Sequence, residues 1–235
     1  MSGASGPASC RHMASSIGWR NRWPSWRTIT PITWADSARF TDARPVRRNW
    51  LTSALSMMTA LVYLLAYTPL KKIHPLSTFV GAFPGAMPGV LGWTAIRGRL
   101  DWEAFVLFSI MFFWQFPHFH SIALLYREDY ERAGIRMLPV VEHDGRSTAR
   151  AIVLYGGALL PVTFAPTLMG IAGLGYLFGA ALLGLALYYF CLRVWREALP
   201  VSSPQAKILA RQLLQATVIY LPLLFALMMI DARRG

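Results

Sequence analysis

The chain has 235 residues, of which 55% are hydrophobic and 14% are charged, and its mean hydropathy is +0.40. This composition argues against a soluble globular domain, because too few polar residues remain to cover several apolar elements. The net charge of +12 does not indicate a nucleic-acid partner, because the cations lie mainly between hydrophobic runs, where they orient a protein in a bilayer. We therefore predict an all-α fold, a polytopic transmembrane helical bundle.

Residues 1–50 are predicted to be an irregular basic segment ahead of a transmembrane domain over residues 51–235. The segment mixes Arg, Ser, Trp and Pro without periodicity, and its first acidic residue is Asp36. It is interpreted as a solvated segment or a mispredicted start. A mitochondrial transit peptide is the alternative, because such peptides are also rich in Arg and Ser and poor in acidic residues.

Five stretches without Asp, Glu, Lys or Arg follow, at 49–70, 73–96, 104–126, 151–192 and 212–230. A span needs about 20 mostly apolar residues, so the fourth stretch can hold two helices joined by the glycine-rich turn at 170–175. The sequence thus predicts six transmembrane helices. Eleven Lys and Arg residues fall in the loops on one side and four on the other, which places the first side in the cytoplasm.

The second predicted helix is irregular and follows a charged loop. In "YTPLKK", Tyr67 and Lys71 are one helical turn apart, which fits either a binding site or an interfacial Tyr beside a snorkelling Lys. Pro84 and Pro88 interrupt this second helix itself. Membranes tolerate such breaks only where protein or a cavity satisfies the freed carbonyl groups.

The third predicted helix carries Trp114, Gln115, Pro117 and His118 within its apolar run. In hydrocarbon, such groups face the bundle interior or a cavity, and Pro117 is expected to kink the helix. The spacings of three and four residues place Gln115 and Trp114 on the face of His118, so we expect this face to line a cavity. The simpler alternative is hydrogen bonding to neighbouring helices.

The loop after this helix, "REDYER", places Glu128 and Asp129 between Arg127 and Arg132. Carboxylates suit Mg²⁺ and guanidinium groups suit phosphate oxygens, so a Mg²⁺-bound diphosphate fits the loop. Ion pairs at i, i+4 on a helix account for the same residues equally well. Two irregular helices with charged ends on one side predict one cavity, open to the cytoplasm.

The runs "YTPLKK", "GAFPGAMPGVLGW", "WQFPHF" and "REDYERAGIRMLP" resemble the haem O synthases, or protohaem IX farnesyltransferases, a branch of the UbiA-type membrane prenyltransferases. The resemblance begins near residue 54 and implies a helical bundle, usually of nine spans. It implies an enzyme that transfers the farnesyl group of farnesyl diphosphate to a vinyl group of haem B, with Mg²⁺ as cofactor, making haem O for haem-copper oxidases. We expect a bacterial inner membrane, with a mitochondrial inner membrane as the alternative, and haem A synthase or oxidase assembly proteins as partners.

Carried over by position, the resemblance assigns Mg²⁺ binding to Asp129 and Glu128 and gives catalytic roles to Asp129, Lys71 and His118. The residues expected to bind substrate are Tyr67, Arg127, Arg132, Trp114 and Gln115. The aromatic side chains expected to line the pocket for an allylic cation are Trp93, Phe113, Trp114, Phe116 and Phe119.

The sequence departs from the family because the first acidic motif, N-x-x-x-D-x-x-x-D, is absent, and only Asp36 and Asp42 lie upstream of the first helix. Eight cations also precede that helix, on the side opposite to the one that the positive-inside rule requires, and an odd number of further helices would remove the conflict. We therefore expect the later two-thirds of a longer fold, weak or inactive alone. The alternatives are a UbiA-type enzyme for a quinone precursor and a non-catalytic haem-handling membrane protein.

Overall fold

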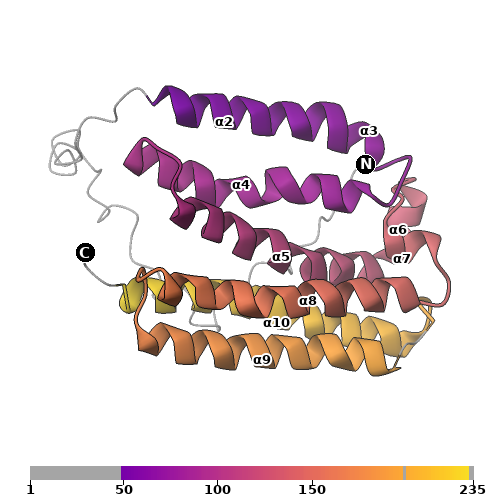
Figure 1. Cartoon of the computed structure of the whole chain (residues 1–235). Coiled ribbons are helices and arrows are strands. Elements are labelled where there is room, and N and C mark those ends of the chain that lie inside the picture. The colour runs from indigo at the N-terminus through magenta and orange to yellow at the C-terminus, as the bar shows by residue number, and fades with distance from the viewer. Residues whose placement is uncertain (1–48, 198–199, 233–235) are drawn as a thin grey trace, which may run out of the picture. The chain divides into compact units, whose positions relative to one another are not determined.

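The computed structural model describes residues 49–197 and 200–232, which form a bundle of antiparallel helices (Figure 1). Six helical stretches are long and apolar enough to cross a membrane: Trp50–Leu70, Ser77–Arg97, Trp102–Leu125, Arg146–Leu168, Leu174–Glu197 and Pro204–Ile230. The prediction of an all-α bundle with six membrane-spanning helices is confirmed for the described residues. The predicted irregular segment lies outside them, apart from its last two residues.

The first stretch consists of three consecutive parts, α2 (Trp50–Leu61), the π-helix η3 (Val62–Tyr67) and α3 (Thr68–Leu70). The other spans are α4 (Ser77–Arg97), α5 (Trp102–Leu125), α8 (Arg146–Leu168), α9 (Leu174–Glu197) and α10 (Pro204–Ile230). Two short helices, α6 (Arg127–Arg132) and α7 (Leu138–Val141), lie in the connection between α5 and α8. π-Helical turns are rare and are found often at functional sites.

The apolar core lies among α5, α8, α9 and α10. Tyr176 and Tyr220 are the largest side chains buried there, and the Tyr176 hydroxyl donates to the carbonyl of Thr163 at 2.9 Å. Gly156 lets α8 approach α9 closely, because a Cβ atom added there would lie 2.8 Å from Sγ of Cys191. Small residues at such contacts allow membrane helices to pack without a hydrophobic driving force.

Helix α2 lies beside α4 at the edge of the bundle, and none of its residues is buried (Figure 1). Polar groups hold the start of α2 to α4: the side chain of Asn49 donates to the carbonyl of Thr94, and Oγ1 of Thr52 donates to Oγ1 of Thr94 at 3.0 Å. Apolar side chains of η3, among them Leu64 and Leu65, are exposed on the surface of the bundle.

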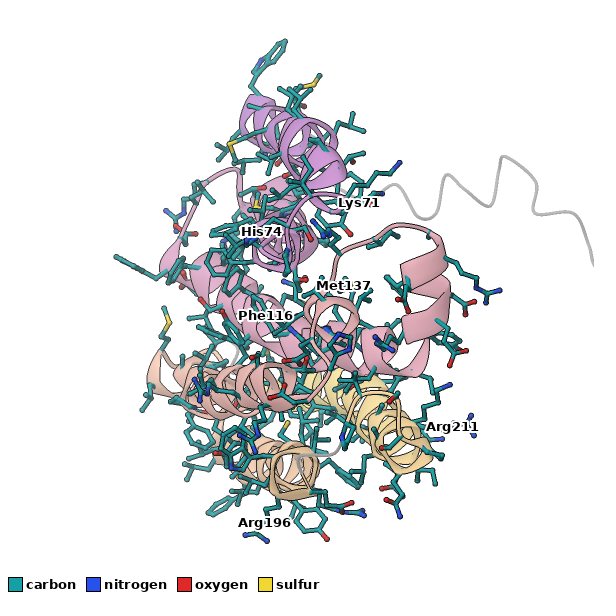
Figure 2. The ribbon with its side chains drawn as sticks, turned by 90° about the vertical axis from the view of Figure 1, so that its right-hand side faces the viewer. Lys71, His74, Phe116, Met137, Arg196 and Arg211 are labelled. Carbon is teal, nitrogen blue, oxygen red and sulfur yellow. The ribbon has the colours of Figure 1, made fainter. Side chains whose placement is uncertain are left out.

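The cations that were predicted to share one side of the membrane lie at one end of the bundle, which we call the basic end. Its members are Lys71, Lys72, Arg127, Arg132, Arg136, Arg146, Arg150, Arg193, Arg196, Lys207 and Arg211. Figure 2 views the bundle from this end and labels Lys71, Arg196 and Arg211. Arg97, the last residue of α4, and Arg99, in the connection between α4 and α5, lie at the opposite end.

The turn between α8 and α9 occurs within the predicted glycine-rich hinge. Gly170 has a φ of 74°, a left-handed conformation that glycine adopts without steric cost. The carboxylate of Asp231, at the end of α10, accepts a hydrogen bond of 2.7 Å from the backbone N–H of Tyr176 in the first turn of α9. One side chain therefore satisfies the start of α9 and joins it to the end of α10.

We expect Asp231→Ala to destabilise the bundle, because the first turn of α9 loses a hydrogen-bond acceptor and a favourably placed negative charge. The loss should be about 1 kcal/mol and is measured as a lower thermal midpoint of the purified protein in detergent. Glu131→Ala removes an exposed carboxylate from α6 and serves as the control. Equal midpoints for the two variants would contradict the role given to Asp231.

Candidate functional site

A cavity of about 670 Å³ lies near the basic end, between α2 with η3, α4 and the connection from α6 to α7. Its lining includes the ammonium-bearing side chain of Lys71 and the phenolic side chains of Tyr63, Tyr67 and Tyr130, with Phe119 of α5 on the apolar wall. The loop "YTPLKK" and the helix "REDYER" therefore border one cavity. This is the cavity that we predicted from two irregular helices with charged ends on the same side.

Tyr67 and Lys71 both line this cavity, one turn apart. The Nζ atom of Lys71 lies 5.7 Å from the centroid of the Tyr67 ring, within the range of a cation–π contact. The ring rests on α4 at Gly81, where an added Cβ atom would lie 2.7 Å from Cδ2 of Tyr67. Glycine at position 81 is thus required for the position of the tyrosine.

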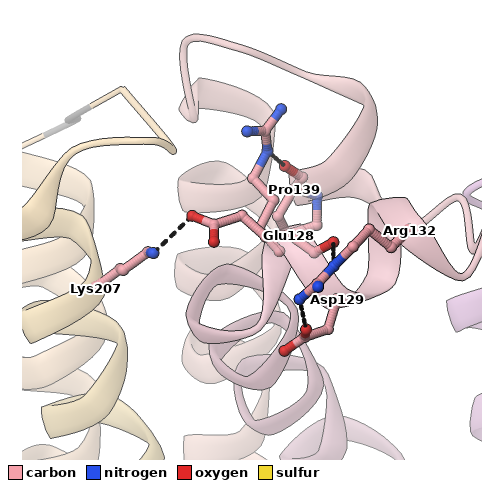
Figure 3. A network of polar contacts seen from close by, with 6 residues as sticks. Glu128, Asp129, Arg132, Pro139 and Lys207 are labelled. Carbon is pink, nitrogen blue, oxygen red and sulfur yellow. Dashed lines mark hydrogen bonds and ion pairs between the residues drawn. The ribbon is translucent and has the colours of Figure 1, made fainter.

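Glu128 and Asp129, two of the three acidic residues of α6, have different partners (Figure 3). Glu128 Oε1 lies 2.8 Å from Nζ of Lys207 on α10, whereas Asp129 pairs with Arg132. The hydrogen bond and the charge of Lys207 hold the pKa of Glu128 below its usual range. The alternative of i, i+4 ion pairs is not what forms, because Arg132 reaches Asp129 at i, i+3 and only the backbone carbonyl of Glu128.

A metal site in the described part of the chain has few donors, since residues 49–197 and 200–232 contain no group of three or more His, Cys, Asp or Glu side chains. Mg²⁺ is commonly held by one or two carboxylates together with substrate phosphates. Asp129, an exposed carboxylate beside the cavity residue Tyr130, fits that mode. Glu128 is also exposed, and each of the two carboxylates already has a cation as partner, Lys207 for Glu128 and Arg132 for Asp129.

Arg127 and Arg132, predicted to bind substrate, have partners within their own segment. The Nε–H of Arg127 donates to the carbonyl of Pro139 at 3.1 Å, which joins α6 to α7 (Figure 3). Neither arginine is among the residues that line the cavity, whereas Tyr130 between them is. Burial raises the pKa of Tyr130, so its hydroxyl remains a proton donor at neutral pH.

The expectation that Gln115 shares a cavity-lining face with Trp114 and His118 is wrong. Trp114 Nε1–H donates to the carbonyl of Thr217 on α10 at 2.9 Å, and His118 Nδ1 lies 2.9 Å from Oγ1 of Thr217. Gln115 instead donates to the carbonyl of Ala82 on α4 at 2.7 Å. Positions three apart differ in direction by about 60° on a helix, which is enough to reach different neighbours where α5 lies between α4 and α10.

None of these three side chains lines the described cavity. Of the five aromatic residues predicted to line a pocket, only Phe119 lines this cavity. The four that do not are Trp93, Phe113, Trp114 and Phe116. Phe116 stacks on Tyr155 with centroids 3.7 Å apart, and Trp93 donates to Asp101 near the opposite end. Helix packing accounts for these side chains, and α5 continues through Pro117 to Leu125.

Several lining residues were not predicted: Tyr63, Tyr130, Ile135 and Met137. Tyr130 lies within the quoted "REDYER" run, directly after Asp129, so its position in the sequence was a usable signal. The π-helix Val62–Tyr67, which carries two of the three lining tyrosines, has no recognised residue pattern and was not foreseeable.

A second hollow, of about 790 Å³, lies at the opposite end between α2, α4 and α5. Phe83 and Phe105 form part of its apolar wall, and its charged residues are Arg99, Asp101 and Glu103. Arg99 Nε lies 3.0 Å from Asp101, so its cation is already neutralised. With more carboxylates than cations, this hollow disfavours a diphosphate.

Comparison with known proteins identifies the family. The model of the UbiA prenyltransferase family matches residues 46–229. The chain belongs to the UbiA prenyltransferase family. The resemblance of its four runs is thereby confirmed, and UbiA membership agrees with the six apolar helices of a multi-pass membrane protein.

Curated relatives within the UbiA family carry the name protoheme IX farnesyltransferase. The proteins of Koribacter versatilis, Solibacter usitatus and Cytophaga hutchinsonii are 66%, 51% and 38% identical over 183, 183 and 177 residues. The alignments cover 78%, 78% and 75% of this chain but 59%, 60% and 59% of the relatives. The chain thus spans about three fifths of the length of the relatives it matches, and no solved structure matched it.

We expect Gly81→Ala to destabilise the UbiA fold by about 1–3 kcal/mol, because the new methyl group overpacks the contact with Tyr67. Gly92→Ala is the matched control, since no atom lies within 4 Å of its added Cβ and alanine favours a helix. Thermal unfolding in detergent measures both variants. If Gly81→Ala were as stable as Gly92→Ala, the close approach of Tyr67 to α4 would be wrong.

The ion pair of Glu128 with Lys207 should depend on pH. A carboxyl group with a lowered pKa in the folded state contributes stability above its unfolded pKa of about 4.3, and the contribution is lost as the pH falls through the folded value. A double-mutant cycle of Glu128→Gln and Lys207→Met should therefore show coupling at pH 7 and none at about pH 2. Coupling that persists at the acidic pH would contradict the ion pair.

Proposed function

We propose that the protein transfers the farnesyl group of farnesyl diphosphate to a vinyl group of haem B and so makes haem O. The cavity at the basic end carries this proposal, because it combines an apolar wall with Lys71 and three tyrosines. The name shared by relatives of up to 66% identity supports haem B as the acceptor.

The first step of this reaction breaks the bond between C1 of the allylic group and oxygen, and the electron pair leaves with the diphosphate. The π electrons of the vinyl group then form the bond to C1, and the cation left on the other vinyl carbon takes the oxygen of one water molecule, which releases a proton. Growing negative charge on the leaving group requires cations and hydrogen-bond donors that are already in place. None of the ion pairs formed by the described residues involves Lys71, so its charge is available for the diphosphate. The hydroxyl of Tyr130, which keeps its proton, would be a further donor.

The cofactor we propose is Mg²⁺, which would neutralise diphosphate oxygens when bound. Asp129 would hold it, and the pair with Arg132 would keep this carboxylate at the basic end. The rings of Tyr63, Tyr67 and Phe119 line the same cavity, and their faces would stabilise the allylic cation after the diphosphate leaves. The haem-binding roles of His118, Trp114 and Gln115 stay predictions, as do the substrate-binding roles of Arg127 and Arg132.

We further propose that the protein resides in a bacterial inner membrane with its basic end in the cytoplasm. The excess of Lys and Arg at that end supports this orientation. Haem A synthase or oxidase assembly proteins would then receive the product. A UbiA enzyme for a quinone precursor is the second candidate, because the family match by itself leaves the acceptor open.

Because the first acidic motif is absent, the test uses a version of the protein extended by the N-terminal part of a relative that carries this motif. Membranes containing this version are incubated with haem B, farnesyl diphosphate and Mg²⁺, and haem O is measured by mass. Lys71→Ala should lower the rate about 100-fold, the usual effect of removing one group that stabilises transition-state charge. Lys72→Ala is the matched control, because Lys72 is exposed and absent from the cavity lining. Asp129→Asn or removal of Mg²⁺ should abolish turnover.

Two results would contradict the proposal. If the wild-type membranes make no haem O, a non-catalytic haem-handling role gains support. If they prenylate only a quinone precursor, the acceptor proposed here is wrong.

A further inference from the structure

The connection between α6 and α7 passes along the cavity. We call residues 133–137 the strap. Ile135 and Met137 both line the cavity, and the intervening Arg136 is exposed. The backbone N–H of Ile135 donates to the carbonyl of Tyr130 at 2.9 Å, which fixes the start of the strap to α6. Figure 2 labels Met137 and Lys71 in the view from the basic end.

Arg136 joins the strap to the connection between α3 and α4. Its backbone N–H donates to the carbonyl of Lys71 at 2.8 Å, and its Nη1 donates to the carbonyl of Ile73 at 3.3 Å. These contacts link residues more than sixty positions apart in the sequence. Arg136 takes part in none of the ion pairs formed within the described residues. Its hydrogen bonds to other segments are those to the two carbonyl groups.

The position of Arg136 has a simple physical cause. The helical stretch Trp50–Leu70 ends just before Lys71, and the last carbonyl groups of a helix lack partners within the helix. A cation at this end also interacts favourably with the helix dipole. Arg136 therefore supplies both a donor and a positive charge where the chain beside the cavity needs them.

We propose that Arg136 is a positioning residue for prenyl transfer. Its guanidinium group joins the strap to the carbonyl of Ile73, next to the backbone bond to Lys71, and so keeps the strap closed against water that would reach the allylic cation. The consequence rests on the proposed function: if water reaches the allylic cation, its oxygen bonds to C1 and a proton leaves to solvent. The product is then farnesol instead of haem O.

The first experiment measures closure without any catalysis. Ser77, in the first turn of α4, lines the cavity and is 1% exposed, so Ser77→Cys places a thiol where a closed strap protects it. The background carries Cys10→Ser and Cys191→Ala, and a water-soluble maleimide labels the membranes. Arg136→Met retains the backbone donor but loses the guanidinium group, and it should raise the labelling rate about fivefold, the effect of losing one hydrogen bond.

Two variants control this experiment. Arg136→Lys keeps a cation and a donor, so it should bring the labelling rate back toward the wild-type value. Arg146→Gln removes an exposed arginine of the basic end that pairs with Asp144, and it should leave the rate unchanged. Equal labelling of Arg136→Met and Arg146→Gln would overturn the proposal.

The second experiment measures the ratio of farnesol to haem O in the same membranes. Arg136→Met should raise the ratio about fivefold, Arg136→Lys should restore it, and Arg146→Gln should not change it. An unchanged ratio in active Arg136→Met membranes would overturn the exclusion of water. If even the wild-type membranes form no product, the proposed function fails, and the labelling rates alone decide whether Arg136 closes the strap.

Discussion

Hydrocarbon offers no partner to a polar group, so a polar side chain within the bundle is stabilised by a partner in the protein. Among the buried side chains of the described residues, only the hydroxyls of Thr78 and Tyr220 lack one. This constraint accounts for the contacts of α5. Trp114 and His118 meet Thr217 on α10, and Gln115 meets the carbonyl of Ala82 on α4. These groups hold helices together. The same requirement separates them from the cavity at the basic end, where Lys71 has no carboxylate partner among the described residues.

The cavity therefore differs from the rest of the bundle in its charge rather than in its size. The hollow at the opposite end is larger, but Arg99 there is neutralised by Asp101 and accompanied by Glu103. An anionic leaving group is stabilised by a cation that is not already paired with a carboxylate. Lys71 is such a cation, and it lines the cavity at the basic end. The position of that charge therefore favours the basic end as the site of the proposed diphosphate.

The sequence predicted much of this arrangement. Apolar runs between charged loops were sufficient for six spans and two distinct ends, because length and hydropathy alone determine what crosses a bilayer. Tyr67 and Lys71 were also placed correctly beside one cavity, since both belong to one short helical turn. The prediction failed for Gln115, whose partner depends on where α4 and α10 lie around α5.

Contacts between distant segments were beyond the reach of residue patterns. Nothing in the run "AGIRMLP" shows that Arg136 bonds to the carbonyls of Lys71 and Ile73, because that contact depends on how α6 leaves α5. The π-helical turn Val62–Tyr67 likewise adds one residue to a turn without a recognised signature. Both features shape the cavity. The residues that outline it could therefore not be predicted from the sequence, whereas its location could.

The central claim is that the prenyl diphosphate occupies the cavity at the basic end. A farnesyl diphosphate analogue with a photoreactive group on its chain, cross-linked in membranes and mapped by mass spectrometry, tests this most directly. The account predicts adducts on lining residues of that cavity such as Tyr63, Phe119 and Met137, lost on competition with farnesyl diphosphate. Competed adducts on Phe83, Phe105 or Phe108, which line the opposite hollow, would contradict it.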